Sequence, residues 1–274
     1  MTHAELVKSS PRPQAWVRFL YFLRKSLNIF EMEMRKLRHE PTDLLTRAAQ
    51  PFIWLVIFGQ VLSGIRAIPT GESSYIEFMA PGVLAQSVLF VSIFYGLALI
   101  WERDLGIIHK FLASPVPREA LVVGKGLSAG IRGFSQAIIV ILLASFLGVR
   151  LNLNPLNILG VISIVFLGAL TFSTFSLLIA LWVKTRERFM GVGQFVTMPL
   201  FFASNAIYPI EMMPDWLQAI AKVNPLSYMV DALRTLMLPG SASVFGLGTD
   251  FAVLILVSAV LVWVAGRRYP SFVV

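Results

Sequence analysis

The sequence predicts an all-α protein that crosses a lipid bilayer several times. Of its 274 residues, 57% are hydrophobic and only 14% are charged, whereas about a quarter of a typical soluble domain is charged. The mean hydropathy is +0.75. A water-soluble domain of this size would lack the charge to cover its surface. These values therefore exclude an ordinary soluble enzyme and a disordered chain.

Long uncharged runs mark the expected membrane spans. A helix needs about 20 mostly apolar residues to cross a bilayer core of about 30 Å. Six runs approach this length, and the third extends backward past Arg132 and the sixth past Asp250. The expected spans are residues 48–65, 78–101, 133–149, 155–183, 189–210 and 251–266. Backbone groups in hydrocarbon must bond within the chain, and the alternating pattern of a β-barrel is absent, so we expect helices.

Lysine and arginine indicate the orientation of these spans. Nineteen of the 23 lysine and arginine residues lie in residues 1–47, 102–132, 184–188 and 267–268. The other four lie in the segments expected on the opposite side of the membrane. Cytoplasmic segments of membrane proteins carry this excess of positive charge. Both termini are therefore expected in the cytoplasm, which agrees with an even number of spans. The pI near 10 is then explained by topology, and no nucleic-acid partner is expected.

The expected organisation begins with a cytoplasmic N-terminus, residues 1–47, which contains an amphipathic helix. Apolar side chains recur every three or four residues between 14 and 40, with basic residues beside them, until Pro41 interrupts the pattern. They are Trp16, Phe19, Leu23, Leu27, Phe30, Met34 and Leu37. Such a helix lies in the membrane interface. It either anchors the N-terminus or transmits motion from a cytoplasmic partner, and the pattern alone leaves both open.

A six-helix transmembrane domain, residues 48–266, and a cytoplasmic tail, residues 267–274, complete this organisation. Within the domain, residues 205–240 combine prolines with closely spaced charges, so they cannot form another crossing. We expect short re-entrant helices that form an outer lid before the last span. Its apolar face would be Met213, Trp216, Leu217 and Ile220, and further lid residues are Tyr208, Asp231 and Arg234.

Motifs for enzymatic chemistry are absent or ambiguous. No G-x-x-x-x-G-K-[ST] phosphate loop occurs, so ATP hydrolysis by this chain is not expected. There is no cysteine, and the three histidines do not have metal-ligand spacing, so no metal site is expected. One stretch, Gly126-Leu-Ser128-Ala-Gly130, matches a nucleophile elbow, but it also matches the G-x-x-x-G pattern of closely packed membrane helices. Since it begins a membrane helix and no histidine is near, we favour packing.

The inner segment 102–125 is the longest segment expected on the cytoplasmic side. It begins with the charged residues Glu102, Arg103 and Asp104 and contains a turn at 114–117. From its composition it is either a solvated connector or a docking site for a cytoplasmic protein.

Three motifs in this chain resemble those of the type-2 ABC transporter permeases, in the drug-resistance and nodulation-factor exporter branches. The inner segment resembles E-R-x-x-G…L-x-S-P-x-x-R-x-x-L-x-x-G-K. The matching residues are Glu102, Arg103, Gly106, Leu112, Ser114, Pro115, Arg118, Leu121, Gly124 and Lys125. The stretch from Asn224 to Arg234 resembles N-P-[LF]-[ST]-Y-x-[VL]-[DE]-x-[LI]-R, and residues 205–217 resemble the outer helices of the family. The chain departs from the family pattern at 107–109, where many members carry Thr-Leu-Glu.

The resemblance implies a permease subunit that pairs with a second copy of itself and with two ATP-binding cassette subunits. ATP and Mg²⁺ would bind those subunits, and no cofactor would bind this chain. The cargo would be an amphipathic drug, a lipid or a lipid-linked glycan, exported across the cell membrane. The residues implied in coupling to the ATPase are Glu102, Arg103, Asp104, Gly106 and His109. Those implied along the substrate pathway are Phe90, Phe94, Phe195 and Phe201.

An alternative is a membrane-embedded enzyme or lipid-modifying protein without ATP coupling. It would need polar groups that converge within the spans. These are scarce, and residues 171–176 form the main cluster. Hydroxyls on membrane helices usually bond to nearby backbone instead.

The expected topology can be tested with reporter fusions. Because nineteen of the 23 basic residues fall on one side, fusions at Gly71 and Gly240 should report the outside and a fusion at Arg186 the cytoplasm. Alkaline phosphatase and green fluorescent protein report the two sides in opposite ways. Reversal at any of the three positions would contradict the six-span topology.

Overall fold

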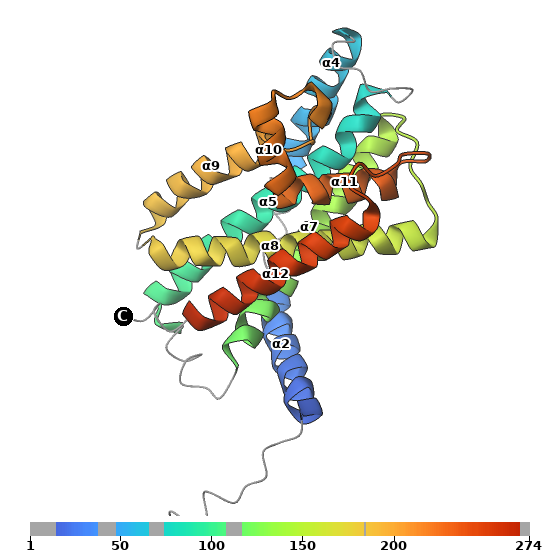
Figure 1. Cartoon of the computed structure of the whole chain (residues 1–274). Helices are drawn as coiled ribbons and strands as arrows, with labels where there is room; N and C mark the ends of the chain where they lie inside the picture. The colour runs from blue at the N-terminus through green and yellow to red at the C-terminus, as the bar shows by residue number, and fades with distance from the viewer. Residues whose placement is uncertain (1–14, 38–47, 66–73, 108–116, 184, 269–274) are drawn as a thin grey trace, which may run out of the picture.

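In the computed structural model, residues 15–37, 48–65, 74–107, 117–183 and 185–268 are described, and they contain helices and turns but no strand (Figure 1). The elements are α2 (Ala15–Leu37), η1 (Ile53–Phe58), α4 (Gly59–Ile65), α5 (Tyr75–Asp104), α7 (Arg118–Phe146), α8 (Pro155–Trp182), α9 (Arg186–Phe202), η2 (Ile210–Met212), α10 (Asp215–Val223), α11 (Pro225–Met237) and α12 (Leu247–Arg268). The prediction of an all-α fold is confirmed.

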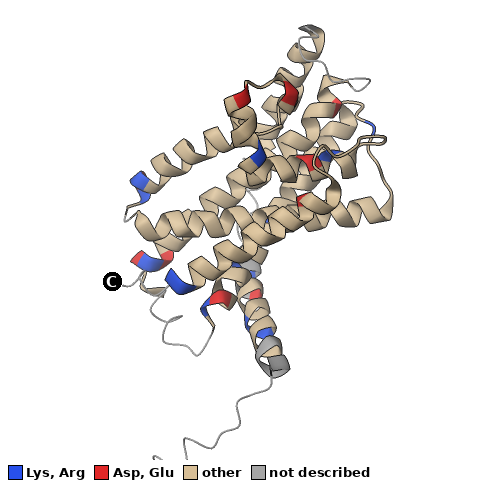
Figure 2. Ribbon diagram, viewed as in Figure 1, with Lys and Arg blue, Asp and Glu red and all other residues tan. Residues whose placement is uncertain are grey.

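Four of the described helices, α5, α7, α8 and α12, are long and apolar enough to cross a membrane. A helix at Ala48–Gly64 is apolar but shorter, and α9 has 17 residues. In Figure 2 the charged residues gather toward the two ends of the molecule, and the helices between them carry almost none. This distribution is that of a chain whose middle lies in hydrocarbon.

Two helix boundaries differ from the sequence prediction. α7 begins at Arg118, fifteen residues before the expected span, so Lys125 lies inside a helix rather than in a loop. Glu102 to Asp104 form the last turn of α5. The expected inner loop 102–125 is therefore helical at both ends. At the other boundary, α9 ends at Phe202 instead of continuing to 210.

Glycines on α7 allow α8 to approach closely. A Cβ on Gly126 would lie 2.2 Å from Cδ1 of Leu170, and one on Gly130 would lie 2.4 Å from Cδ1 of Phe166. A side chain at either position would therefore displace Leu170 or Phe166. Membrane helices use small residues in this way because lipid supplies no hydrophobic force between them. The packing interpretation of the G-x-x-x-G stretch is confirmed, and Ser128 between the glycines is buried within the same helix.

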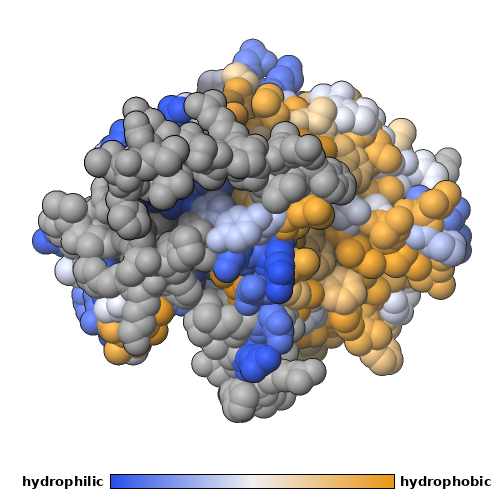
Figure 3. All heavy atoms as spheres, turned by 90° about the horizontal axis from the view of Figure 1, so that it is seen from below, coloured by the Kyte–Doolittle hydropathy of each residue, from blue (hydrophilic) through white to orange (hydrophobic). Residues whose placement is uncertain are grey.

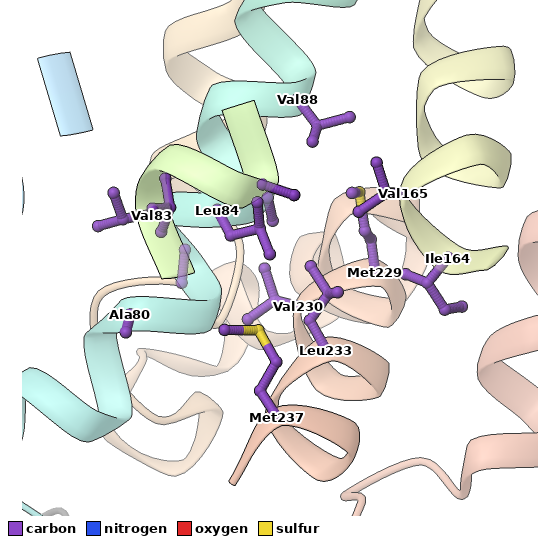
Figure 4. Packing of buried hydrophobic residues seen from close by; sticks show 14 of the residues in the cluster. Ala80, Val83, Leu84, Val88, Ile164, Val165, Met229, Val230, Leu233 and Met237 are labelled. Atoms are coloured by element: carbon purple, nitrogen blue, oxygen red, sulfur yellow. The ribbon is translucent and has the colours of Figure 1, made fainter. Parts of the chain in front are cut away.

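α11 is part of the core and does not rest on its surface. Figure 4 shows Met229, Val230, Leu233 and Met237 of this helix among the side chains of α5 and α8. Asn224 begins the helix by accepting a hydrogen bond from the Leu226 amide, and Pro225 occupies the first turn. The expected lid 205–240 thus has two parts: α10 lies at the surface and α11 packs inside this end of the bundle.

α2 is a helix, as predicted, and it packs on α7. A Cβ on Gly124 would lie 2.8 Å from both Cβ of Ile29 and the carbonyl oxygen of Ser26, so the two helices meet at this glycine. Leu23 and Leu27, from the predicted apolar stripe, face away from the bundle and are exposed. Seen from below, hydrophilic residues gather at the centre and an apolar surface lies to one side (Figure 3). The exposed stripe is available to the membrane interface.

Substitution of Gly130 by Ala tests the α7–α8 contact. The added methyl group would overlap the Phe166 ring, so we expect a loss of about 1–3 kcal/mol in the free energy of unfolding and a lower thermal midpoint in detergent. Gly191→Ala is the matched control because nothing lies within 4 Å of its Cβ position. Alanine favours a helix, so this control should not lower the midpoint. Equal midpoints for the two variants would contradict close packing at Gly130.

Candidate functional site

The last turn of α5 presents a charged surface whose geometry depends on Gly106. This glycine has a φ of +68°, a conformation that residues with a side chain rarely adopt. Its amide donates to the carbonyl of Arg103, and the amide of Leu105 donates to that of Trp101. These bonds satisfy the last carbonyls of the helix. Gly106 therefore terminates α5 immediately after Glu102, Arg103 and Asp104.

Glu102 and Lys125 form a buried ion pair that joins α5 to α7. Nζ of Lys125 lies 2.6 Å from Oε2 of Glu102, and the two side chains are 6% and 7% exposed. Charges are costly in the interior unless they are paired and hydrogen-bonded. The pair therefore fixes where the end of α5 lies along the first turns of α7. Glu102 faces the interior, so its effect on any partner is indirect.

The exposed charges beside this pair connect α5 to α9. The guanidinium of Arg186 lies 3.0 Å from Oδ2 of Asp104 and 3.5 Å from the ring centroid of Trp101. Arg103 lies 3.4 Å from Oδ1 of the same carboxylate. We call Trp101, Arg103, Asp104 and Arg186 the α5–α9 charge cluster. It is partly exposed and carries both signs of charge, which suits the docking of another protein.

Of the residues predicted to couple to an ATPase, Arg103, Asp104 and Gly106 lie together at the end of α5, and Glu102 lies behind them. His109 lies outside the described residues. Lys125 and Arg186 were not predicted as site residues. For Lys125 a signal existed, because it ends the same motif that begins with Glu102. The sequence contains no such signal for Arg186, since its partner Asp104 is 82 residues away.

The four predicted pathway phenylalanines do not form one surface. Phe90 and Phe94 stack on α5, with ring centroids 6.2 Å apart. Phe195 on α9 is 77% exposed. Phe201 is fully buried and packs edge-on against Trp54, so it belongs to the core.

At the opposite end of the bundle, Asp231 and Arg234 are buried on α11 and have different partners. Arg234 donates to the carbonyl of Asn205 at 2.7 Å. Asp231 accepts from the hydroxyl of Ser243 at 2.7 Å and from the amide of Phe245 at 2.9 Å. Burial lowers the pKa of Arg234 from its ordinary value to about 10, while the carboxylates of Asp231 and Glu211 act to raise it. The guanidinium therefore stays charged at neutral pH, and the two residues tie α11 to the segments on either side of it.

The surface helix α10 has a smaller buried face than expected. Met213 is buried and Leu217 is half-buried, whereas Trp216 and Ile220 are exposed. Tyr208 donates to the carbonyl of Phe202, which folds the preceding turn onto the end of α9. Trp216 thus projects from this end of the molecule, as tryptophans at membrane interfaces do.

Hydroxyls in the middle of α8 bond mainly to backbone. Thr171 donates to the carbonyl of Leu167, Ser173 to that of Leu170, and Ser176 to that of Ile93 on α5. Thr171 also lies 2.6 Å from the hydroxyl of Ser258 on α12. Among the described residues, no group of three or more histidine, aspartate or glutamate side chains could hold a metal ion. Thr171 and Ser176 therefore join α8 to α12 and α5, whereas the buried hydroxyl of Thr174 has no hydrogen-bond partner among the described residues.

Comparison with known proteins agrees with this architecture. The sequence profile of the ABC-2 type transporter family matches residues 28–238. The ycf38 protein of Cyanophora paradoxa, named as a transport permease, is 30% identical over 220 residues, which cover 79% of this chain and 75% of that protein. A daunorubicin resistance ABC transporter permease of Streptomyces coeruleorubidus is 29% identical over 215 residues, 78% of this chain and 75% of the relative. The inner membrane transport permease YadH of Escherichia coli K12 is 26% identical over 188 residues, which cover 66% of this chain and 70% of that protein.

The buried ion pair predicts a pattern of stabilities. Glu102→Gln or Lys125→Met removes one member of the buried pair, so each should lower the free energy of unfolding by about 3–5 kcal/mol. Either single change already breaks the contact, so the double variant should lower the free energy of unfolding by much less than the sum of the two single effects. Thermal midpoints of the three variants in one detergent measure this coupling.

Arg186→Gln is the control for this cycle, because it removes an ion pair that is partly exposed. This substitution should lower the free energy of unfolding by about 0–1 kcal/mol. Strictly additive losses in the Glu102 and Lys125 variants would contradict a direct interaction between the two side chains.

Proposed function

The chain belongs to the ABC-2 type transporter family, and from this premise we propose that it is the membrane-spanning subunit of an ATP-driven exporter. The observation that carries the proposal is the family match across residues 28–238, which contains the α5–α9 charge cluster. Because the sequence has no phosphate loop, ATP and Mg²⁺ would bind two separate ATP-binding cassette subunits. A second copy of this chain would complete the transporter.

In this proposal the α5–α9 charge cluster contacts the ATP-binding subunit. The buried Glu102–Lys125 pair positions it, and Gly106 turns the chain away from the end of α5. α2 packs on α7 one residue before Lys125, at Gly124. Motion of a docked subunit would therefore reach α2, α5 and α7 together. This arrangement favours the second interpretation of the N-terminal helix, in which it transmits motion.

The orientation follows from the distribution of basic residues. Six crossings would be the helix at Ala48–Gly64 and α5, α7, α8, α9 and α12, with both termini in the cytoplasm of a cell membrane. Residues 1–47 and 267–274 would form the cytoplasmic parts and 48–266 the transmembrane domain. α10 and the 205–210 turn would cap the outer end.

The proposed cargo is an amphipathic drug, a lipid or a lipid-linked glycan. Two observations support this cargo: one of the relatives is a daunorubicin resistance permease, and α5 and α9 carry aromatic side chains. Phe94 lies beside Gly193 of α9, and Phe195 is exposed on the same helix. Phe90, Phe94 and Phe195 are the residues that we propose along the pathway.

Reversal of the exposed charges tests the docking surface. The double variant Arg103→Glu, Asp104→Lys should bind the ATP-binding subunit at least about tenfold more weakly, because opposed charges at an interface become like charges. The amount of subunit that co-purifies with the membrane chain, and the ATPase rate of the complex, measure the effect. Glu102 stays unchanged so that the buried pair is intact.

Asp215→Lys, Lys222→Glu is the matched control, since it makes the same kind of change on α10 at the opposite end of the bundle. It should leave assembly and ATPase activity unchanged. If the α10 variant loses the subunit and the α5 variant keeps it, the proposed docking surface and orientation are both wrong. If neither wild type nor variant binds an ATP-binding subunit, the proposed function is wrong.

A further inference from the structure

An apolar groove lies between α7 and α8 at the end of the bundle opposite the Glu102–Lys125 pair. Its volume is about 260 Å³. Ile138, Ile141 and Leu142 of α7 line one side, and Leu153 and Ile158 line the other. Asn152 is the one polar residue in the lining. The groove is smaller than the pockets of about 300–1,000 Å³ that hold drug-sized ligands, so it does not fit a bulky cargo.

The groove lies beyond the glycine contacts between α7 and α8. Gly126 and Gly130 hold α8 close, and at Gly133 the Cβ position is 3.4 Å from Val165. Beyond Gly133, α7 carries no glycine up to its last residue, Phe146. The residues of α7 that line the groove, from Phe134 to Leu142, all follow Gly133.

The walls of the groove are fixed by backbone hydrogen bonds. α7 ends at a turn in which Gly148 has a φ of +81°. The amide of Asn152 then donates to the carbonyl of Met237 at 2.7 Å, which pins the segment 149–154 to the end of α11. Oδ1 of Asn152 accepts from the amide of Asn154, and Oδ1 of Asn154 accepts from the amide of Leu156. A fixed cavity binds with little loss of conformational freedom.

An exposed basic residue adjoins the lining of this groove in the sequence. Arg150 directly precedes the lining residue Leu151 and is exposed. Its backbone amide donates to Oε1 of Glu77 at 3.4 Å, and its guanidinium has no ion pair with a residue that the structure describes. An apolar groove with an exposed arginine next to its lining in sequence matches a molecule that has a hydrocarbon chain and an anionic head.

We propose that this groove binds an acyl chain of an anionic phospholipid, whose phosphate contacts Arg150. A peptide segment is a poorer match, because Asn152 is the one polar side chain in the lining that could bond to its backbone. Lipid tails are about as apolar as leucine, so apolarity alone does not favour the groove over bulk lipid. Packing within the groove and the contact with Arg150 therefore provide the preference for an anionic lipid at this site. With the orientation proposed above, the lipid belongs to the outer leaflet, and only this leaflet assignment depends on that proposal.

The test uses the full chain in nanodiscs that contain phosphatidylcholine and a trace of phosphatidylglycerol with a photoactivatable diazirine on its acyl chain. After illumination, labelled peptides are identified by mass spectrometry. Labels should concentrate on peptides 137–142 and 151–162. Leu142→Trp fills the groove and should reduce this labelling at least fivefold. Leu256→Trp is the matched control, since Leu256 is an exposed leucine on α12, and it should leave labelling unchanged.

The headgroup contact is tested in the same nanodiscs. Wild type should prefer the phosphatidylglycerol probe to the same diazirine probe with a phosphatidylcholine head by about fivefold, the effect of one basic residue beside an anionic lipid. Arg150→Gln should abolish this preference, whereas Lys222→Gln, another exposed cation at this end, should retain it.

Two results would overturn the lipid site. Labelling of α7 and α8 that is unaffected by Leu142→Trp would mean that these surfaces contact only bulk lipid. Crosslinks from the groove to a second copy of the chain, without lipid labels, would mean that a protein covers it. Neither measurement requires ATP or an ATP-binding subunit, so failure here is distinct from failure of the proposed function.

Discussion

Two opposite charges buried at one end of the bundle determine how α5 and α7 are arranged. Glu102 ends one long apolar helix and Lys125 lies in the first turns of the next, and their ion pair offsets the cost of burying both charges. A shift of either helix along its axis by one residue, about 1.5 Å, would break this contact. The pair therefore fixes the register of the two helices at the end where the charged surface lies.

The other contacts at this end depend on that register. Ile29 of α2 packs against Gly124, which is next to Lys125, and Gly106 ends α5 four residues after Glu102. Arg186 then joins the end of α5 to α9 through Asp104. A protein docked on the exposed charges would act on a connected set of helices. Glycines continue the close packing along α7 until Gly133, and the residues that line the apolar groove follow it.

Much of the fold could be predicted because apolar runs and bilayer thickness restrict where helices lie. The runs 78–101 and 155–183 correspond closely to α5 and α8. The start of α7 could not be found in this way, since charge in the sequence was read as exposure and Lys125 is buried by a partner that is distant in sequence. Similarly, α11 contains Asp231 and Arg234, which suggested a surface lid, yet both are buried and form hydrogen bonds with groups from other segments.

The candidate site was found in part for the same reason. Local sequence indicates that Glu102 to Asp104 and Gly106 lie together, but it does not show that Glu102 faces inward or that Arg186 approaches from another helix. These facts depend on contacts between segments 23 and 82 residues apart. The aromatic pathway residues were the least predictable, because an aromatic on a membrane helix packs in the core, as Phe201 does, as readily as it faces a cavity.

Site-directed crosslinking tests the central claim most directly, since the chain contains no cysteine and any introduced one is unique. A cysteine at Arg103, joined by a short photoactivatable reagent, should crosslink to the ATP-binding subunit in the assembled transporter. A cysteine at Asp215, on α10 at the other end, should not. A crosslink from position 215, with none from position 103, would show that the ATP-binding subunit docks at the opposite end of the bundle and would contradict the account.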